Sequence, residues 1–341
     1  MSSLNFYCVK AYYPKPSIHH LRPTIIEALT PAKEQPKGIF QRIRFLGHLM
    51  SRSFVELKAN DPLRMGGATA FFTTFALPAI LIILIQLFGI FVNPRKIGSE
   101  LIDRLANVLG NTSAMQIKLT LEGFRSLSHN WYVTVLGFIF LMFVATTLFA
   151  VIKNSLDQIW GIKVRPHPGI VFNLKNRARS LVIIILAGLL FFVGLLVEGV
   201  QALLADYLKD IWQSGAVFFI WAINEMVFII IVTIWFTNLF RFLTAGRPKF
   251  SHALIGGFFT AILFTAGKII LRFLMGYSNI KTLYGASGST VLILLFVFYS
   301  AMIFYYGGCF VKVLSEVYDA PIRPVKEAFS FELMEIDPEK D

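Results

Sequence analysis

Four charged side chains lie inside otherwise apolar stretches, and they are the residues whose types and spacing could do chemistry. Lys268 and Arg272 lie four residues apart in one apolar segment, and Glu198 and Glu225 each lie in another. A charge near the centre of an inserted helix costs about 2.5–3.5 kcal/mol. Two acids and two bases at overlapping depths could pair with one another, hold a polar or anionic ligand, or relay protons.

The composition indicates the environment in which these charges must be positioned. The chain has 341 residues, 56% of them hydrophobic and only 15% charged, whereas a soluble domain carries about 25% charged residues. Thr282 to Val311 form a charge-free run of 30 residues, longer than the roughly 18 that indicate a membrane span. The net charge of +12 is then best explained by Lys and Arg in cytoplasmic loops, and we expect no nucleic-acid partner.

We predict an all-α, polytopic membrane protein whose six transmembrane helices form one bundle. Residues 1–37 are expected to be largely irregular and cytoplasmic, 38–60 an amphipathic interfacial helix, 61–314 the transmembrane domain, and 315–341 an acidic cytoplasmic tail. The predicted spans are about 66–92, 131–152, 180–204, 215–239, 252–275 and 289–314.

Amphipathic segments flank the first predicted span. In 38–60, apolar residues recur at helical spacing and basic residues lie largely elsewhere on the helix. This helix either lies along the membrane surface or packs on the cytoplasmic loops. The long first outer loop, 93–131, is expected to form one or two short amphipathic helices folded against the bundle. Pro78, within the first span, predicts a kink.

The short loops predict the orientation. Loops 153–179 and 240–251 contain nine Lys and Arg residues together, whereas loops 205–214 and 276–288 contain one each. Because basic residues accumulate on the cytoplasmic side, both termini are predicted to be cytoplasmic, in the bacterial cytoplasmic (inner) membrane.

Small residues recur every four positions in span 252–275, which favours close approach of a neighbouring helix. Lys268 and Arg272 extend from the same face, towards the protein interior. We therefore predict that the four charged residues form an intramembrane polar cluster lining an outward-facing cavity. The cluster could bind a ligand or relay protons, or it could be an ion-pair network that determines helix register, and Arg272 could instead reach the outer headgroups. The small residues are Ala253, Gly257, Ala261 and Thr265.

Signatures of soluble enzymes are missing from the sequence. It contains no phosphate loop, no HExxH and no paired CxxC, and its six histidines have no metal-ligand spacing. We therefore predict no catalytic residues, no metal and no cofactor.

Several motifs occur in order along the chain, and their residues are Asp61, Pro62, Pro78, Asn154, Trp160, Tyr284, Gly285, Ser287 and Gly288. Taken together, they resemble the YihY/BrkB family of bacterial inner-membrane proteins over about residues 40–318. That resemblance implies six membrane helices with cytoplasmic ends. Members once carried the name ribonuclease BN, yet nothing here resembles the histidine-rich metal site of such a nuclease. Phe296 and Cys309 depart from the family pattern, so a proton or ion role of an acid at the latter position does not carry over.

Two functions from different classes follow from these patterns. The leading hypothesis is a permease- or exporter-like protein that handles a polar, anionic or lipid-linked substrate. The alternative is a non-transport scaffold in envelope biogenesis, and an intramembrane nuclease is disfavoured. The expected partners are membrane lipids and the unknown substrate, and a homo-oligomer stays open.

Overall fold

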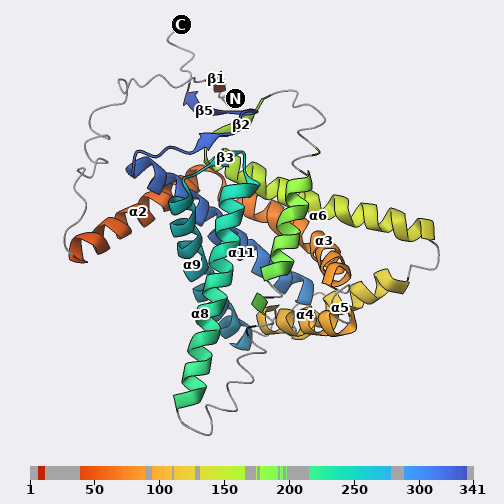
Figure 1. Ribbon diagram of the computed structural model, residues 1–341. Helices are drawn as coiled ribbons and strands as arrows, with labels where there is room; N and C mark the ends of the chain where they lie inside the picture. The colour runs from red at the N-terminus through yellow and green to blue at the C-terminus, as the bar shows by residue number, and fades with distance from the viewer. Residues whose placement is uncertain are drawn as a thin grey trace, which may run out of the picture.

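Helices make up most of the protein, whose structure is a computed structural model. Long α-helices cross one another, and short strands gather at one end (Figure 1). The structure describes residues 7–11, 39–88, 94–109, 111–126, 131–165, 174, 177–190, 193–194, 197, 215–277 and 288–335.

Five helices are long and apolar enough to cross a membrane, within the residues described. The shortest has 24 residues, and about 20 suffice for a hydrocarbon core of roughly 30 Å. The protein is therefore a helical membrane protein with several spans. These helices are α3 (Pro62–Phe88), α6 (Trp131–Ile159), α8 (Gly215–Asn238), α9 (Phe250–Tyr277) and α11 (Gly288–Val317).

The five helices coincide with the first, second, fourth, fifth and sixth predicted spans. The third predicted span, 180–204, overlaps a helix of residues 177–190. Most of the rest of that span lies outside the described residues. The number of membrane crossings therefore stays a prediction.

Helix α11 is the centre of the bundle, because it packs against α3, α9 and α2 (Ile39–Ala59). Small residues permit the contacts of α9. Ala253 and Ala261 are fully buried, and a Cβ built at Gly257 would lie 2.9 Å from the carbonyl oxygen of Thr233 in α8. Gly257, in the middle of the stripe of small residues, thus lies where α9 meets α8.

Two short helices, α4 (Pro94–Leu109) and α5 (Asn111–Ser126), follow α3. They pack against each other and against α3 and α11. Leu101, Ile117 and Leu121 are buried in the main hydrophobic core. The segment between the first two spans is therefore folded onto the bundle.

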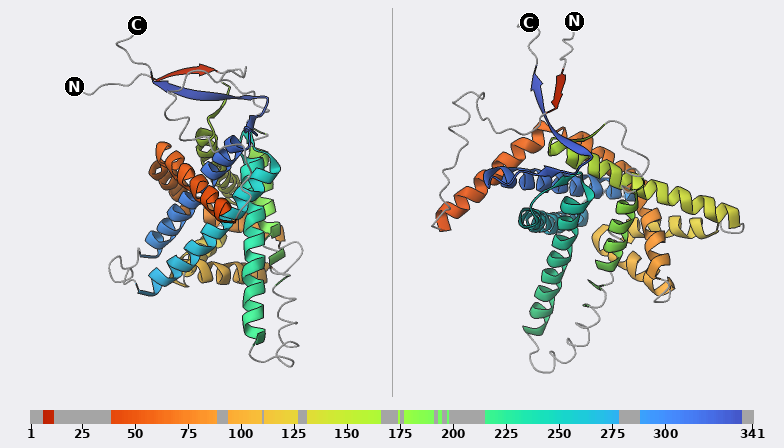
Figure 2. Two further views of the ribbon diagram at one scale, coloured as in Figure 1. Left: turned by 90° about the vertical axis from the view of Figure 1, so that its left-hand side faces the viewer. Right: turned by 45° about the horizontal axis from the view of Figure 1, so that its top comes forward.

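Five short strands within the described residues add a feature that the all-α prediction did not contain. Strands β1 (Tyr7–Ala11), β5 (Ala328–Glu335) and β2 (Ile162–Val164) form an antiparallel sheet in the order β1-β5-β2. Figure 2 shows β1 and β5 side by side beyond the helix ends. The predicted tail thus contains a strand, because β5 is stabilised by pairing with distant segments that its local sequence does not reveal.

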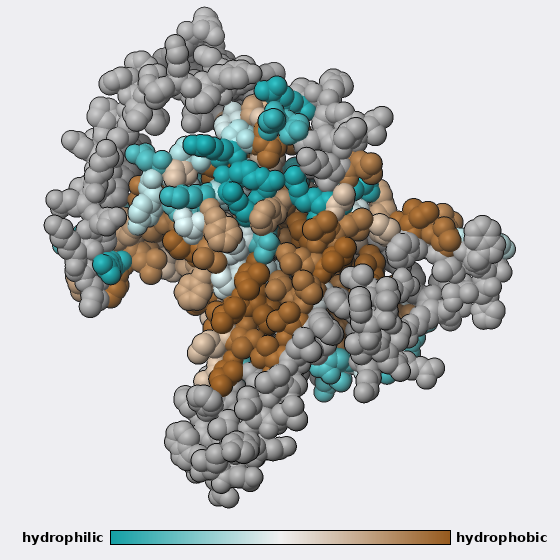
Figure 3. All heavy atoms as spheres, in the orientation of Figure 1, coloured by the Kyte–Doolittle hydropathy of each residue, from teal (hydrophilic) through white to brown (hydrophobic). Residues whose placement is uncertain are grey.

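The second sheet consists of β3 (Gly246–Arg247) and β4 (Arg323–Pro324). All five strands lie at the end where α3 and α9 begin and α6, α8 and α11 end (Figure 1). Hydrophilic residues gather over this end, and hydrophobic residues cover the long helices (Figure 3). The protein therefore has a hydrophilic end, where the strands lie, and an apolar helix bundle.

Candidate functional site

Glu225 of α8 and Lys268 of α9 form an ion pair between two membrane helices. Lys268 Nζ donates to Glu225 Oε1 at 3.0 Å, and the same ammonium lies 3.8 Å from the ring centroid of Phe228. The Lys268 side chain is 12% exposed and the Glu225 side chain 27%. Each charge therefore has its opposite beside it, which offsets part of the cost of placing an ion in an apolar surrounding.

The hairpin geometry of α8 and α9 explains how this pair forms. A short connection links α8, through the π-helical turn η1 (Leu239–Leu243), to α9. Glu225 precedes Leu243 by 18 residues, and Lys268 follows Phe250 by 18. In antiparallel helices with equal rise per residue, positions equidistant from the turn lie at the same height.

The two other predicted members of the cluster are not placed beside this pair. Glu198 lies outside the described residues. Arg272 belongs to α9, but its side chain is not among those described. The structure thus brings together Glu225 and Lys268, and the four-residue cluster stays a prediction.

A cavity of about 490 Å³ lies elsewhere, between α3, α5, α6 and α11. Neither Glu225 nor Lys268 is among its lining residues, so it differs from the polar cavity that the sequence suggested. Its walls are aromatic and aliphatic, interrupted by a few hydroxyls and one amide. The lining residues include Phe71, Phe75, Phe143, Thr74, Pro78 and Gln116.

Most of the hydroxyls at this cavity already have acceptors on their own helices. Thr74 Oγ1 donates to the Ala70 carbonyl at 2.9 Å, and Thr147 Oγ1 to the Phe143 carbonyl at 2.7 Å. Pro78 has no N–H, so it withholds the helical donor from the Thr74 carbonyl. The cavity is therefore apolar with few polar groups to orient an occupant.

A cation lies beside the cavity wall. Arg177 Nη1 donates to Thr146 Oγ1 at 3.2 Å, and its guanidinium carbon lies 5.1 Å from the ring centroid of Phe143. Phe71, Phe75 and Phe143 are more than half exposed, although each lies in a candidate membrane span. The phenylalanine face is thus exposed on the surface of two candidate membrane spans, with a positive charge beside Phe143.

Sequence reasoning did not identify this site. Phe71, Phe72 and Phe75 share one side of α3, but a span that is apolar all round has no periodicity that separates a cavity wall from a lipid-facing surface. The abundance of Phe, 34 residues in all, was the available signal.

The motif residues near the strand-bearing end have structural contacts. Asp61 adopts a left-handed φ of +50°, and Pro62 is the first residue of α3. Asn154 is exposed on α6, whereas Trp160 is 6% exposed and its Nε1 donates to the Gly308 carbonyl at 3.0 Å. Trp160 thus links the end of α6 to α11.

The remaining motif residues divide between the cavity and the turn before α11. Pro78 lines the cavity, and Gly288 is the first residue of α11. Tyr284, Gly285 and Ser287 lie outside the described residues.

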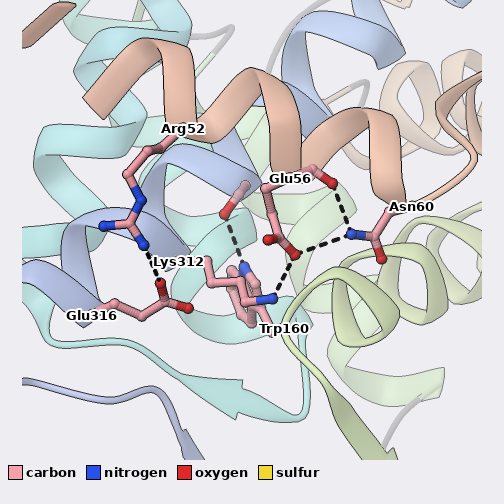
Figure 4. Close-up of polar contacts among 7 residues, drawn as sticks. Arg52, Glu56, Asn60, Trp160, Lys312 and Glu316 are labelled. Carbon is pink, nitrogen blue, oxygen red and sulfur yellow. Dashed lines mark hydrogen bonds and ion pairs between the residues drawn. The ribbon is translucent and has the colours of Figure 1, made fainter. Parts of the chain in front are cut away.

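A polar ladder joins α2 to α11 at the strand-bearing end. Figure 4 shows Lys312 Nζ bonded to Glu56 Oε1 at 2.6 Å and Arg52 bonded to Glu316 at 3.3 Å. Asn60 Nδ2 donates to the same Glu56 carboxylate at 3.1 Å. Because the partners of the two ion pairs are 256 or more residues apart, no local sequence pattern predicts them.

The described part of the chain contains no candidate metal-binding cluster. No group of three His, Cys, Asp or Glu side chains there is arranged to hold a metal ion.

Comparison with known proteins determines the family. The sequence model described as "Virulence factor BrkB" matches residues 53–330, which is most of the chain and includes all five long helices. The chain belongs to the virulence factor BrkB family. The resemblance seen in the motifs is therefore confirmed.

Members with similar sequences are named as membrane proteins in several bacteria. A UPF0761 membrane protein of Psychromonas ingrahamii is 23% identical over 73% of this chain and 82% of its own length. One from Haemophilus influenzae is 21% identical over 81% of this chain and 97% of its own.

A third UPF0761 membrane protein, from Glaesserella parasuis, is 23% identical over 54% of this chain. The match spans only 62% of that relative's length. No solved structure matches the chain.

Proposed function

We propose that this BrkB-family protein is permease- or exporter-like and binds an amphiphilic, lipid-linked molecule whose acyl chain enters the cavity between α3, α5, α6 and α11. The observation that carries the proposal is the cavity itself. Its volume of about 490 Å³ and its phenylalanine walls suit a hydrocarbon chain. Arg177, beside Phe143, supplies a positive charge for an anionic headgroup.

The proposed setting is the bacterial inner membrane, with six spans and both termini cytoplasmic. The excess of Lys and Arg in loops 153–179 and 240–251 supports this orientation. The proposed third span then includes the helix of residues 177–190. Helix α2 is proposed to lie along the cytoplasmic surface, since it leaves Phe40, Ile43 and Phe54 exposed. We propose no catalytic step.

One observation favours a non-transport scaffold instead. Glu225 and Lys268 are paired with each other, as a purely structural ion pair would be. Under this alternative the cavity would bind a lipid permanently, as part of the fold.

The test counts lipids that stay bound to the full chain after delipidation, by native mass spectrometry. Val144→Trp places a large ring in the cavity wall, and Val144→Phe is a milder version that should fold if the first does not. Ile230→Trp, on an exposed part of α8 outside the cavity, is the matched control. Wild type and control should retain a lipid that both Val144 variants lose.

Equal lipid counts in all four proteins would refute the acyl-chain site. A second assay separates the two functions, by following movement of a fluorescent phospholipid between leaflets of reconstituted vesicles. The permease proposal requires movement that Val144→Trp abolishes, whereas a retained lipid without movement supports the scaffold.

A further inference from the structure

Four arginines from four separate elements lie at the strand-bearing end. Arg241 lies in η1, Arg247 in β3, Arg323 in β4, and Arg179 in the helix of residues 177–190. In the antiparallel register Arg247 pairs directly with Arg323. Side chains at directly opposite positions share one face, with Cβ atoms about 5 Å apart, and like charges there destabilise the pair.

Backbone carbonyls, which are neutral, hold two of these arginines. Arg247 Nη1 donates to the carbonyl oxygen of Arg241, and Arg241 Nη1 donates to that of Pro248. Arg179, Arg241 and Arg247 are each partly buried. Arg323, in contrast, is exposed. The guanidinium groups of Arg241 and Arg247 are thus held close together by neutral acceptors, which do not cancel their charges.

The pKa of Arg247 also reflects the positive charges close to it. Burial lowers the pKa of its guanidinium, the charges of Arg179 and Arg241 lower it further, and Asp157 acts in the opposite direction. When a guanidinium lies near other guanidinium groups, an anion bound beside it stabilises its charged form.

The nearby carboxylate is already engaged. Asp157 Oδ2 accepts from Lys153 Nζ at 2.8 Å, and Asp157 Oδ1 accepts from the backbone N–H of Ala245, also at 2.8 Å. Within the described part of the chain, no ion pair joins any of the four arginines to a carboxylate. Asp157 is therefore shared between Lys153, with which it pairs directly, and Arg247, on which its charge also acts.

The backbone beside Arg241 and Arg247 is closely packed. Leu243, Thr244 and Ala245 are at most 2% exposed, and Thr244 Oγ1 donates to the Gly246 carbonyl at 2.9 Å. The π-helical turn before them is a conformation that occurs often at functional sites. Basic loops explain why arginines occur on this side, but they do not require that Arg179, Arg241 and Arg247 be partly buried close to one another.

We propose that Arg179, Arg241, Arg247 and Arg323 form a binding site for a phosphate-type oxyanion at the strand-bearing end of the bundle. Guanidinium groups bind phosphate oxygens in a bidentate manner, and an anion held between several of them offsets their mutual repulsion. The anion is either a soluble phosphate or the headgroup of an anionic lipid. This proposal is independent of the acyl-chain cavity.

The first arm of the test uses soluble phosphate. The full chain in phosphatidylcholine nanodiscs is titrated with sodium phosphate, against sodium chloride at equal ionic strength, and the thermal unfolding midpoint is measured. If the ligand is soluble, phosphate raises the midpoint of wild type by several degrees. Arg247→Gln and Arg179→Gln should each weaken the response at least tenfold in concentration.

The second arm replaces part of the phosphatidylcholine with phosphatidylglycerol. If the ligand is a headgroup, this lipid raises the wild-type midpoint, and both glutamine variants lose the effect. Arg247→Gln removes repulsion, so at low salt its midpoint without phosphate should equal or exceed that of wild type.

Lys326→Gln is the matched control, because Lys326 is exposed near β4 and its replacement changes the net charge equally. The control should respond as wild type does. The site is refuted if neither arm gives an arginine-dependent shift. It is also refuted if Lys326→Gln loses as much response as Arg247→Gln, since the effect would then be diffuse surface charge.

Discussion

Glu56 of α2 and Lys312 of α11 face each other across the helix pair, with Lys312 Nζ 2.6 Å from Glu56 Oε1. One turn away on each helix, Arg52 faces Glu316 at 3.3 Å. One turn in the other direction along α11, the Gly308 carbonyl accepts from Trp160 at the end of α6. Successive turns of α11 thus contact α2 and α6, and these contacts determine the register in which the helices meet.

The Glu56–Lys312 contact should contribute more to stability than its neighbour. Both of its side chains are less than a third exposed, and Lys312→Gln should lower the free energy of unfolding by about 1 kcal/mol. Arg52→Gln is the control, and its half-exposed partner predicts a loss below about 0.5 kcal/mol. Chemical unfolding of the full chain in detergent measures both, and equal losses would contradict this ranking.

Exchanging the positions of Glu225 and Lys268 is predicted to preserve their ion pair and most of the stability. Glu225→Lys and Lys268→Glu each place two like charges in an apolar setting, and each should lower stability by about 1–3 kcal/mol. The double exchange restores opposite charges and should recover most of that loss, measured by thermal unfolding in detergent.

A functional role of this pair has a separate readout. Lipid movement in reconstituted vesicles should recover with the exchanged pair if only pairing matters. If stability returns but movement does not, the residues take part in function individually, and the purely structural interpretation is wrong.

Gly161 is predicted to be intolerant of a side chain. It follows α6 with φ of +61°, and a Cβ there would lie 2.8 Å from the carbonyl oxygen of Phe331 in β5. Gly161→Ala should lower the free energy of unfolding by about 1–2 kcal/mol. Gly137→Ala, in α6 itself with no atom within 4 Å of the new Cβ, should be neutral or slightly stabilising. Equal effects of the two substitutions would show that β5 does not restrain this turn.

The membrane orientation can be tested with reporter fusions. Alkaline phosphatase fused after residue 205 should be active, because loop 205–214, with its single basic residue, is predicted to lie outside. The same enzyme fused after Asp341 should be inactive. Activity in the reverse pattern would invert the topology and place the arginine group on the outer side.

Local sequence was sufficient for the helices and for one long-range contact. Long apolar runs predict spans wherever they occur, and five of them coincide with helices because hydrogen bonding within a helix needs no distant partner. Glu225 and Lys268 were predicted to meet because they lie on consecutive spans joined by a short loop. Their depths therefore follow from counting residues.

The sequence by itself thus determined the membrane class, the helices and the family, since each depends on composition, periodicity or ordered motifs. Tertiary structure decided what depends on contacts between distant segments. Strand β5 exists because Tyr7–Ala11 and Ile162–Val164 pair with it. The phenylalanine cavity exists because α3, α5, α6 and α11 meet around Pro78. Arg247 faces Arg323 only through the register of two short strands, which no local pattern encodes.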